Sequence, residues 1–428
     1  MTTLLIIAVL VLGFMVVLRL SRVAELTGAL RGHREEVISE QDNRTSGRLM
    51  WAFGAIYLIW FIWLPLEYHE VFLPQAASTQ GVWIDAMYTF NWWMLGIVFF
   101  GTNIALFYFA GRYYHRDNRR AFWYPHNNKL ELLWTVVPSV VLVGVIIYGL
   151  SVWNKITAAP APGTMEVEIY SKQFDWTFRY PGKDGKLGAT DFRLINADNP
   201  LGIVTRNTIT NRLAELHEEV DKATAERDAL AEVLPEDIKK KKSEEIAHLN
   251  RLIERIMGLR TLMEQDVATN GDNSTYLHGA DDKVTKEFHL PVNTDVELII
   301  RSQDVIHSAY LPHMRAQMNA VPGMATRMHL VPTITTDSMR TITGNPDFEY
   351  ILLCNKVCGV SHYNMQSPLT VETAGAFKVW TIMLTPFEKA GVPPVEASSG
   401  GEATLSDTVK TEIAGGAEAA AGTNNQSN

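Results

Sequence analysis

Long apolar stretches alternate with charged connections through the first third of the chain. The apolar stretches run over 4–17, 50–66, 92–110 and 133–153. The last three are about as long as a helix that crosses a hydrocarbon core of roughly 30 Å. The first lacks a basic segment before it and a small-residue cleavage site after it, so we interpret it as a retained helix, with a cleaved signal peptide as the alternative. The pattern predicts a membrane anchor of about four transmembrane helices.

Basic residues in the connections predict the orientation of this anchor. The connections 19–48 and 112–129 are rich in arginine, whereas 67–90 contains neither lysine nor arginine. Because positively charged loops stay on the cytoplasmic side, 67–90 and everything after Trp153 should lie outside. We therefore expect a multi-pass protein of a bacterial inner membrane whose later part lies in the periplasm.

After the apolar stretches, short runs with partial alternation predict β-strands. The first covers Val167–Tyr180, and others are predicted over 284–300, 328–333, 350–353 and 369–384. Strands of this length separated by turns are typical of a small Greek-key sandwich. The sequence thus predicts an all-β periplasmic domain.

Between the first predicted strand and the later ones, apolar residues recur with the period of a helix. Apolar residues recur at spacings of three and four over 209–234 and again over 246–263, and Pro235 separates the two runs. This pattern predicts an antiparallel helical hairpin inserted into the sandwich. From Gly391 onward small and polar residues dominate, which predicts a disordered tail.

Composition and charge argue against one class of partner. The chain has 428 residues, of which 47% are hydrophobic, and this length has room for several domains. Its net charge of −9 comes mostly from the part after the apolar stretches. An acidic exterior argues against nucleic acid as a partner.

The segment Cys354–Met365 contains both cysteines of the chain, together with His362. Thiolate, imidazole and thioether groups favour copper over magnesium or calcium. Two cysteines four residues apart could bridge two metal ions, and His307 would supply a second imidazole. A structural disulfide is the alternative for the two cysteines.

The order of these residues resembles a known family. The spacing Cys-x3-Cys-x3-His-x2-Met, with Asp304-Val305-x-His307-Ser308 and Ala320–Gly323 before it, is similar to subunit 2 of the haem-copper cytochrome c oxidases. In that family the motif binds a dinuclear copper centre, CuA, in a cupredoxin-like domain. The resemblance implies a ligand set: Cys354 and Cys358 as bridging thiolates, His307 and His362 as one imidazole per copper, and Met365 and the backbone carbonyl of Lys356 as axial ligands.

The membrane region carries a second resemblance. The stretches 92–110 and 133–153 match the two-helix hairpin of the family, and Glu131–Pro138 resembles its signature at the start of the second helix. By this resemblance Glu131 would mark the entrance of a proton channel. The two apolar stretches before Trp92 go beyond the common pattern.

Other positions depart from the family. Phe174 stands where the family has the tryptophan linked to electron entry, while Trp176 keeps the second aromatic position. Arg179 replaces an acidic residue common near the docking face. The departures at Phe174 and Arg179 together disfavour docking of an ordinary basic soluble cytochrome c and favour a donor that is membrane-bound or within a supercomplex. Lys356 replaces a glutamate that binds magnesium, and an ammonium group cannot bind a hard cation, so we predict no magnesium site.

The resemblance implies an electron-transfer function. The chain would accept electrons from a c-type cytochrome at CuA and pass them to haem in the catalytic subunit 1, with subunit 3 and membrane lipid as further partners. Oxygen reduction and proton pumping would take place in the partner subunits, so no residue of this chain is catalytic and haem is held only there. The alternatives are a membrane-anchored copper carrier or sensor and a CuA protein similar to nitrous oxide reductase.

These interpretations divide the chain into consecutive regions. The predicted regions are an extra membrane segment with two helices at 1–90, a transmembrane hairpin at 91–155, the first part of the CuA domain at 156–200, the inserted hairpin at 201–280, the remainder of the CuA domain at 281–390 and the tail at 391–428.

Overall fold

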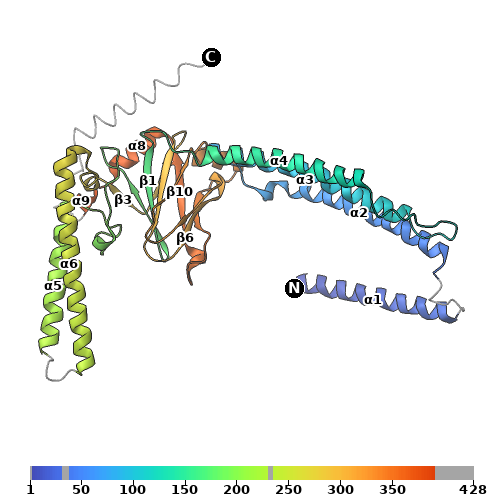
Figure 1. The fold of residues 1–428 in the computed structure, drawn as a ribbon, viewed down its shortest axis with the longest axis horizontal. Helices are drawn as coiled ribbons and strands as arrows, with labels where there is room; N and C mark the ends of the chain where they lie inside the picture. Colours follow the sequence, from blue (N-terminus) through green and yellow to red (C-terminus); the bar gives the residue numbers. More distant parts are fainter. Residues whose placement is uncertain (1, 31–37, 230–234, 391–428) are drawn as a thin grey trace, which may run out of the picture. The chain divides into compact units, whose positions relative to one another are not determined.

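The structure is a computed structural model. It describes residues 2–30, 38–229 and 235–390 (Figure 1). The chain divides into two compact units. Residues 1–73 and 88–146 form the first unit, and 74–87 together with the chain from 147 onward form the second. The predicted tail at 391–428 lies outside the described residues.

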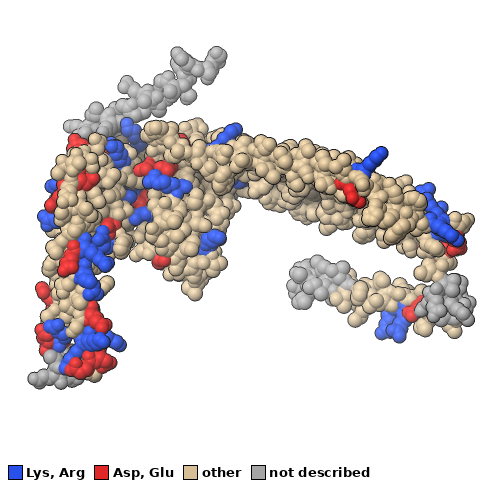
Figure 2. Space-filling view, viewed as in Figure 1, with Lys and Arg blue, Asp and Glu red and all other residues tan. Residues whose placement is uncertain are grey.

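The first unit is helical. It contains α1 (Thr2–Leu30), α2 (Glu40–Phe72) and most of α3 (Thr79–Arg112) and α4 (Asn128–Ile156). By length and composition α2, α3 and α4 can each cross a membrane. The predicted stretch 4–17 lies within α1. The structure does not describe the first side chains of this stretch, so a crossing by α1 stays a prediction. Charged side chains are sparse on these helices and dense on the hairpin formed by α5 and α6 (Figure 2).

Glycines allow α2 and α3 to pack closely. A Cβ atom added to Gly54 on α2 would lie 2.5 Å from Cγ of Phe107 on α3, and one added to Gly111 would lie 2.2 Å from Nε1 of Trp51. Phe107 also packs edge-on against Phe53, with 5.6 Å between the ring centroids. Small residues that let helix backbones approach are typical of packing within membranes.

The second unit contains a sandwich of two five-stranded sheets that enclose an apolar core. Val167, Leu298 and Phe178 from one sheet are buried with Phe288 and Leu352 from the other, and the rings of Phe178 and Phe288 stack 4.5 Å apart. The first sheet has the order β3 (Lys283–Thr285), β2 (Asp175–Tyr180), β1 (Met165–Lys172), β5 (Val296–Ser302) and β8 (Thr326–Leu330). The second has the order β4 (Phe288–Pro291), β10 (Gln366–Glu372), β9 (Tyr350–Cys354), β6 (His307–Leu311) and β7 (Ala316–Ala320). This arrangement confirms the predicted cupredoxin-like sandwich.

Three of the predicted strands were wrong in extent. The stretch 167–180 forms two antiparallel strands, β1 and β2. The stretch 284–300 forms three strands, β3, β4 and β5, because the chain turns twice and contributes to both sheets. The stretch 369–384 ends as a strand at Glu372, where the hydroxyl of Thr373 accepts a hydrogen bond from the amide of Ala376 and begins helix α8 (Ala374–Met383). Short apolar runs do not distinguish a strand from a helix by periodicity alone.

The inserted hairpin consists of α5 (Arg206–Ala229) and α6 (Glu236–Asn270), which lie side by side (Figure 1). Ile209 and Leu216 of α5 are buried against Ile253, Ile256 and Met263 of α6. The predicted hairpin is therefore confirmed, and the spacing of its apolar residues gives its contact face. The region boundaries predicted from sequence stay a prediction.

Candidate metal centre

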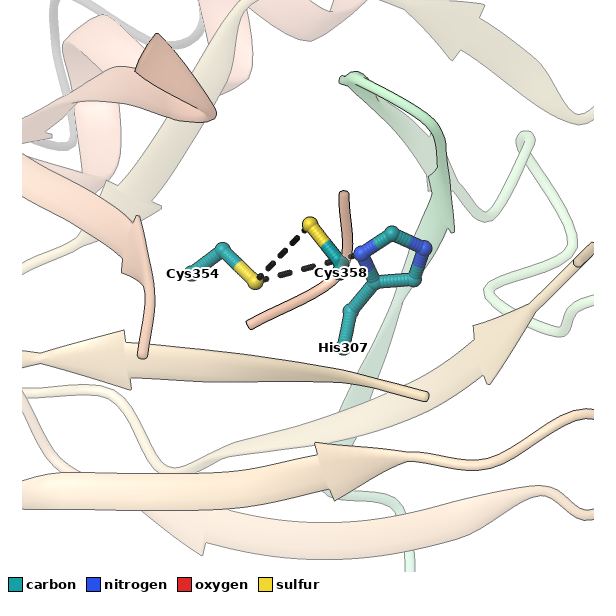
Figure 3. A group of neighbouring side chains, drawn as sticks. All are labelled: His307, Cys354 and Cys358. Atoms are coloured by element: carbon teal, nitrogen blue, oxygen red, sulfur yellow. Dashed lines mark hydrogen bonds between the residues drawn. The ribbon is translucent and has the colours of Figure 1, made fainter. Parts of the chain in front are cut away.

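The loop after β9 and the start of β6 bring the predicted donor residues together. β6 pairs antiparallel with β9, with Ala309 opposite Cys354, so His307 at the start of β6 lies close to the end of β9. Cys358 follows in the loop. His307, Cys354 and Cys358 point toward one another (Figure 3).

Short distances connect the donor atoms through the two sulfurs. Sγ of Cys354 lies 3.9 Å from Sγ of Cys358, 3.8 Å from Nδ1 of His307 and 3.2 Å from the carbonyl oxygen of Lys356. Sγ of Cys358 lies 3.6 Å from Nδ1 of His362 and 3.8 Å from Sδ of Met365. All predicted donors thus converge. Both thiols are free, and their separation is well beyond the roughly 2.05 Å of a disulfide bond.

The site is enclosed by the sandwich and closed by its own loop. His307 is fully buried, and Cys354, Cys358 and Met365 are buried as well. The amide of Cys354 donates to the carbonyl of Met365 at 3.0 Å, which ties the two ends of the loop together. Gly359 has φ of +143°, and a Cβ there would lie 2.7 Å from the ring of Phe174, so the loop requires glycine at this turn.

Asp304 orients one of the predicted imidazoles. Nε2 of His307 donates to the Asp304 carboxylate at 2.9 Å, which leaves Nδ1 of His307 free to bind a metal ion. Burial disfavours the charge of Asp304, yet hydrogen bonds from the amide of Gln173 and from His307 outweigh it and lower the pKa of Asp304. An ionised Asp304 is therefore a strong acceptor.

Gln173 links this carboxylate to the loop Cys354–Met365, which we call the copper loop. Its amide N–H donates to Asp304 at 2.7 Å and its side-chain Nε2 donates to the carbonyl of Cys358 at 2.5 Å. The sequence analysis included Asp304 in a motif without a role, and Gln173 lay unremarked within the predicted strand Val167–Tyr180. The motif around His307 carried a signal for Asp304, whereas the contact of Gln173 with Cys358 arises only in the folded sandwich.

The electrostatics of the thiols suit a bound cation. Burial and the neighbouring Cys354 raise the pKa of the Cys358 thiol to about 11. Two buried thiolates need a positive charge between them, and a metal ion supplies it. Sulfur and imidazole donors match copper better than oxygen-loving cations, so the residues present fit a copper site.

The residues predicted for electron and proton entry lie in different environments. Trp176 is 2% exposed and packs edge-on against His307, with 6.3 Å between the ring centroids. Phe174 is partly exposed beside Gly359. Glu131 is exposed in the first turn of α4, where Asn127 caps the helix. The entry roles of Trp176, Phe174 and Glu131 stay predictions.

The interpretation of Arg179 as a surface residue near a docking face was wrong. Arg179 is 4% exposed and donates to Glu168 at 2.5 Å and to Asp282 at 2.8 Å. Its guanidinium is held between Gly188 and Asp282, the segments just before and after the insertion, which we call the root of the inserted hairpin, so it cannot repel a basic partner at the surface. The exposed Lys356 is the charged residue of the copper loop itself.

A helical membrane unit followed by a cupredoxin-like sandwich with a buried Cys-Cys-His cluster defines a membrane-anchored cupredoxin-like protein. Residues 67–152 match the transmembrane domain of cytochrome c oxidase subunit II, and residues 262–374 match its periplasmic domain. Both matches are to domains of the cytochrome c oxidase subunit II family, which this chain resembles in its membrane part and in its sandwich.

Named relatives extend over most of the chain. The alternative cytochrome c oxidase subunit 2 of Bradyrhizobium diazoefficiens is 28% identical over 305 residues, which cover 71% of this chain and 80% of the relative. Cytochrome c oxidase subunit 2 of Thermostichus vulcanus is 22% identical over 334 residues, which cover 77% and 84%. Among solved structures, the periplasmic domain of subunit II of cytochrome oxidase of Bradyrhizobium japonicum is 15% identical with a TM-score of 0.26, covering 53% of this chain and 96% of that one.

Proposed function

We propose that this chain is the electron-accepting subunit of a cytochrome c oxidase and holds a dinuclear copper centre. It would take electrons from a c-type cytochrome and pass them to haem in the catalytic subunit. The observation that carries the proposal is the convergence of two thiols, two Nδ1 atoms, a thioether and a carbonyl on one buried point. Cys354 and Cys358 would hold the coppers together with His307 and His362, and the metal would supply one-electron transfer.

In this function the protein would restrain the positions of the donor atoms. The rigid sheets fix His307 and Cys354, while Asp304 keeps Nδ1 of His307 free for the metal. Gln173 restrains the backbone at Cys358. Because the ligands are buried and hydrogen-bonded, they need little rearrangement when the charge of the site changes.

The copper loop also offers a surface for the electron donor. Val357, Val360 and Tyr363 are 87%, 90% and 85% exposed around His362. Phe174 lies partly exposed beside this loop, and Trp176 lies behind it against His307. We therefore assign the donor contact to the loop and Phe174, and a buried bridging position to Trp176.

Contacts with the rest of an oxidase complete the proposal. By similarity to the family, α3 and α4 would contact the catalytic subunit, with subunit 3 as a further neighbour. Glu131 would then face the entrance of a proton channel in the partner. An ionisable group at a membrane boundary is costly unless it faces protein or water, which supports this position.

Electron uptake by the assembled oxidase tests the proposal. The complex would be mixed with a reduced c-type cytochrome in a stopped-flow instrument. We expect Cys358→Ser to lose rapid electron uptake, because one bridging thiolate is removed. Ser361→Ala changes the same loop without touching a donor and should keep wild-type uptake. Equal rates in the wild type and in Cys358→Ser would contradict the proposal.

A further inference from the structure

A cavity of about 300 Å³ lies in the membrane unit where α2 begins and α3 ends. Its lining is strongly basic and aromatic: Arg44, Arg48, Arg112 and Arg116 surround it together with Trp51 and Tyr114. In Figure 2, blue side chains gather at the end of the helices that carries the α3–α4 connection. No part of the proposed electron transfer uses this cavity.

The arginines around the cavity have few counter-charges. Glu40 lies 3.6 Å from Arg44, and within the described part of the chain no carboxylate pairs with Arg48, Arg112 or Arg116. Nε of Arg116 is buried and has no hydrogen-bond partner among the described residues. The guanidinium of Arg116 stacks 4.4 Å above the ring of Tyr114, which holds it in place. A buried donor with no partner points to an anion.

Helix packing forms the floor of the cavity. A Cβ atom on Gly47 would lie 2.8 Å from Cδ1 of Tyr114 and 2.9 Å from the carbonyl oxygen of Gly111. Nε1 of Trp51 donates to the carbonyl of Tyr108 at 3.4 Å. The cavity therefore depends on the close approach of α2 and α3, and so on a helix that precedes the two-helix hairpin.

Below the basic lining the helices expose apolar side chains. Phe53 and Phe109 are 55% and 54% exposed, and Trp51 itself is 45% exposed. A ligand that joins a phosphate to hydrocarbon chains would place its phosphate against the arginines and its chains against the apolar side chains. Guanidinium groups bind phosphate through paired hydrogen bonds, and aromatic residues mark the boundary of a membrane.

We propose that this cavity binds the phosphodiester headgroup of an anionic phospholipid in the cytoplasmic leaflet. α4 leads from the α3–α4 connection directly into the part that matches the periplasmic domain, so one membrane crossing separates the connection, on the cytoplasmic side, from that part of the chain. Basic pockets between transmembrane helices on that side suit anionic headgroups. The bound lipid joins α2 to α3.

Lipid retention by the full chain tests this inference. The protein would be purified in a mild detergent, supplied with phosphatidylglycerol or phosphatidylcholine, and examined by native mass spectrometry. We expect the wild type to retain phosphatidylglycerol at least tenfold more strongly than phosphatidylcholine. Arg48→Gln combined with Arg116→Gln should lose this preference. Arg119→Gln combined with Arg120→Gln removes the same charge outside the cavity lining and should keep it.

Two further arms separate the possible outcomes. Millimolar inorganic phosphate should not displace the lipid, and displacement by phosphate would indicate a site for a free anion and overturn the proposal. An equal loss in both double variants would indicate only general attraction between charges, which also overturns it. A photoactivatable phosphatidylglycerol on the wild type should crosslink to 44–51 or 111–116, and crosslinks spread evenly over the helices would contradict the site even if a variant fails to fold.

Discussion

Asp304 is the residue on which the geometry of the proposed copper centre depends most, although it is not itself a predicted ligand. Its carboxylate accepts from Nε2 of His307 and from the amide of Gln173, so one side chain fixes an imidazole and the turn between β1 and β2. Such partners of metal ligands typically contribute a factor of about 10 to 100 in metal affinity.

We therefore expect Asp304→Ala to bind copper about 10- to 100-fold more weakly than the wild type, as measured by competition with a chelator. Asp295→Ala is the matched control, because Asp295 makes the same kind of contact with His329, at 3.1 Å, on strand β8. The control should bind copper normally. An Asp304→Ala variant with unchanged affinity would show that His307 is oriented by the sheet alone.

The predicted donor residues converge in the structure, and most of them are close together in the sequence. Five of the six lie within Cys354–Met365, where spacing along a short loop carries most of the geometry. Arg179 was misjudged because its burial depends on Glu168, Asp282 and the returning chain of the insertion, which are far apart in the sequence. Gln173 escaped notice for the same reason.

At the scale of elements, the root of the inserted hairpin depends on buried charges. Arg179 on β2 binds Glu168 on β1 and Asp282 before β3, and Arg301 on β5 also binds Glu168. Burial favours neutral Glu168, but Arg179 and Arg301 outweigh this effect and lower its pKa. Burial raises the pKa of Asp282 to about 7, against the opposing effect of Arg179. The two carboxyl groups therefore respond to pH differently.

Asp282 makes the stability of the chain depend on pH near neutrality. Its pKa is higher in the folded chain than in the unfolded chain, so its favourable contribution is complete below about pH 4 and is lost as the pH rises through about 7. Between pH 5 and pH 8 we expect the free energy of unfolding to fall by about 2 to 4 kcal/mol from this group. Urea unfolding followed by tryptophan fluorescence measures it.

The variant Asp282→Asn should flatten this dependence, since its side chain does not ionise. Asp281→Asn changes the neighbouring residue and should leave the slope as in the wild type. If Asp282→Asn and the wild type lose the same stability between pH 5 and pH 8, other groups control the dependence and Asp282 is ionised throughout.

Because α2 packs closely against α3 at one glycine and not at another, we expect alanine substitutions at the two positions to affect stability differently. Gly54→Ala places a Cβ against Cβ and Cγ of Phe107, which cannot move far, and should destabilise the helix pair by about 1 to 3 kcal/mol. Gly96→Ala on α3 meets nothing within 4 Å and should be neutral or stabilising. Thermal denaturation in detergent compares the two, and equal effects would contradict close packing at Gly54.

At the scale of the whole molecule, the sequence predicted the order of the helical and β regions better than the residues at which individual elements begin and end. Long apolar stretches and regular helical spacing identified the membrane helices and the inserted hairpin. The sandwich was predicted as a class, yet 284–300 proved to be three strands and 369–384 changed to a helix after Glu372. Sheet membership depends on partners distant in sequence, which alternation within one stretch does not encode.

The central claim is that this membrane-anchored sandwich holds two coppers that share their thiolates. The most direct test is copper stoichiometry with electron paramagnetic resonance on the purified full chain, loaded with copper and then partly reduced. We predict two coppers per chain and a hyperfine pattern of one unpaired electron shared equally by two copper nuclei, and loss of that pattern in Cys354→Ser. One copper per chain with a single-nucleus pattern, or Cys354 and Cys358 joined as a disulfide that takes up no copper, would contradict the account.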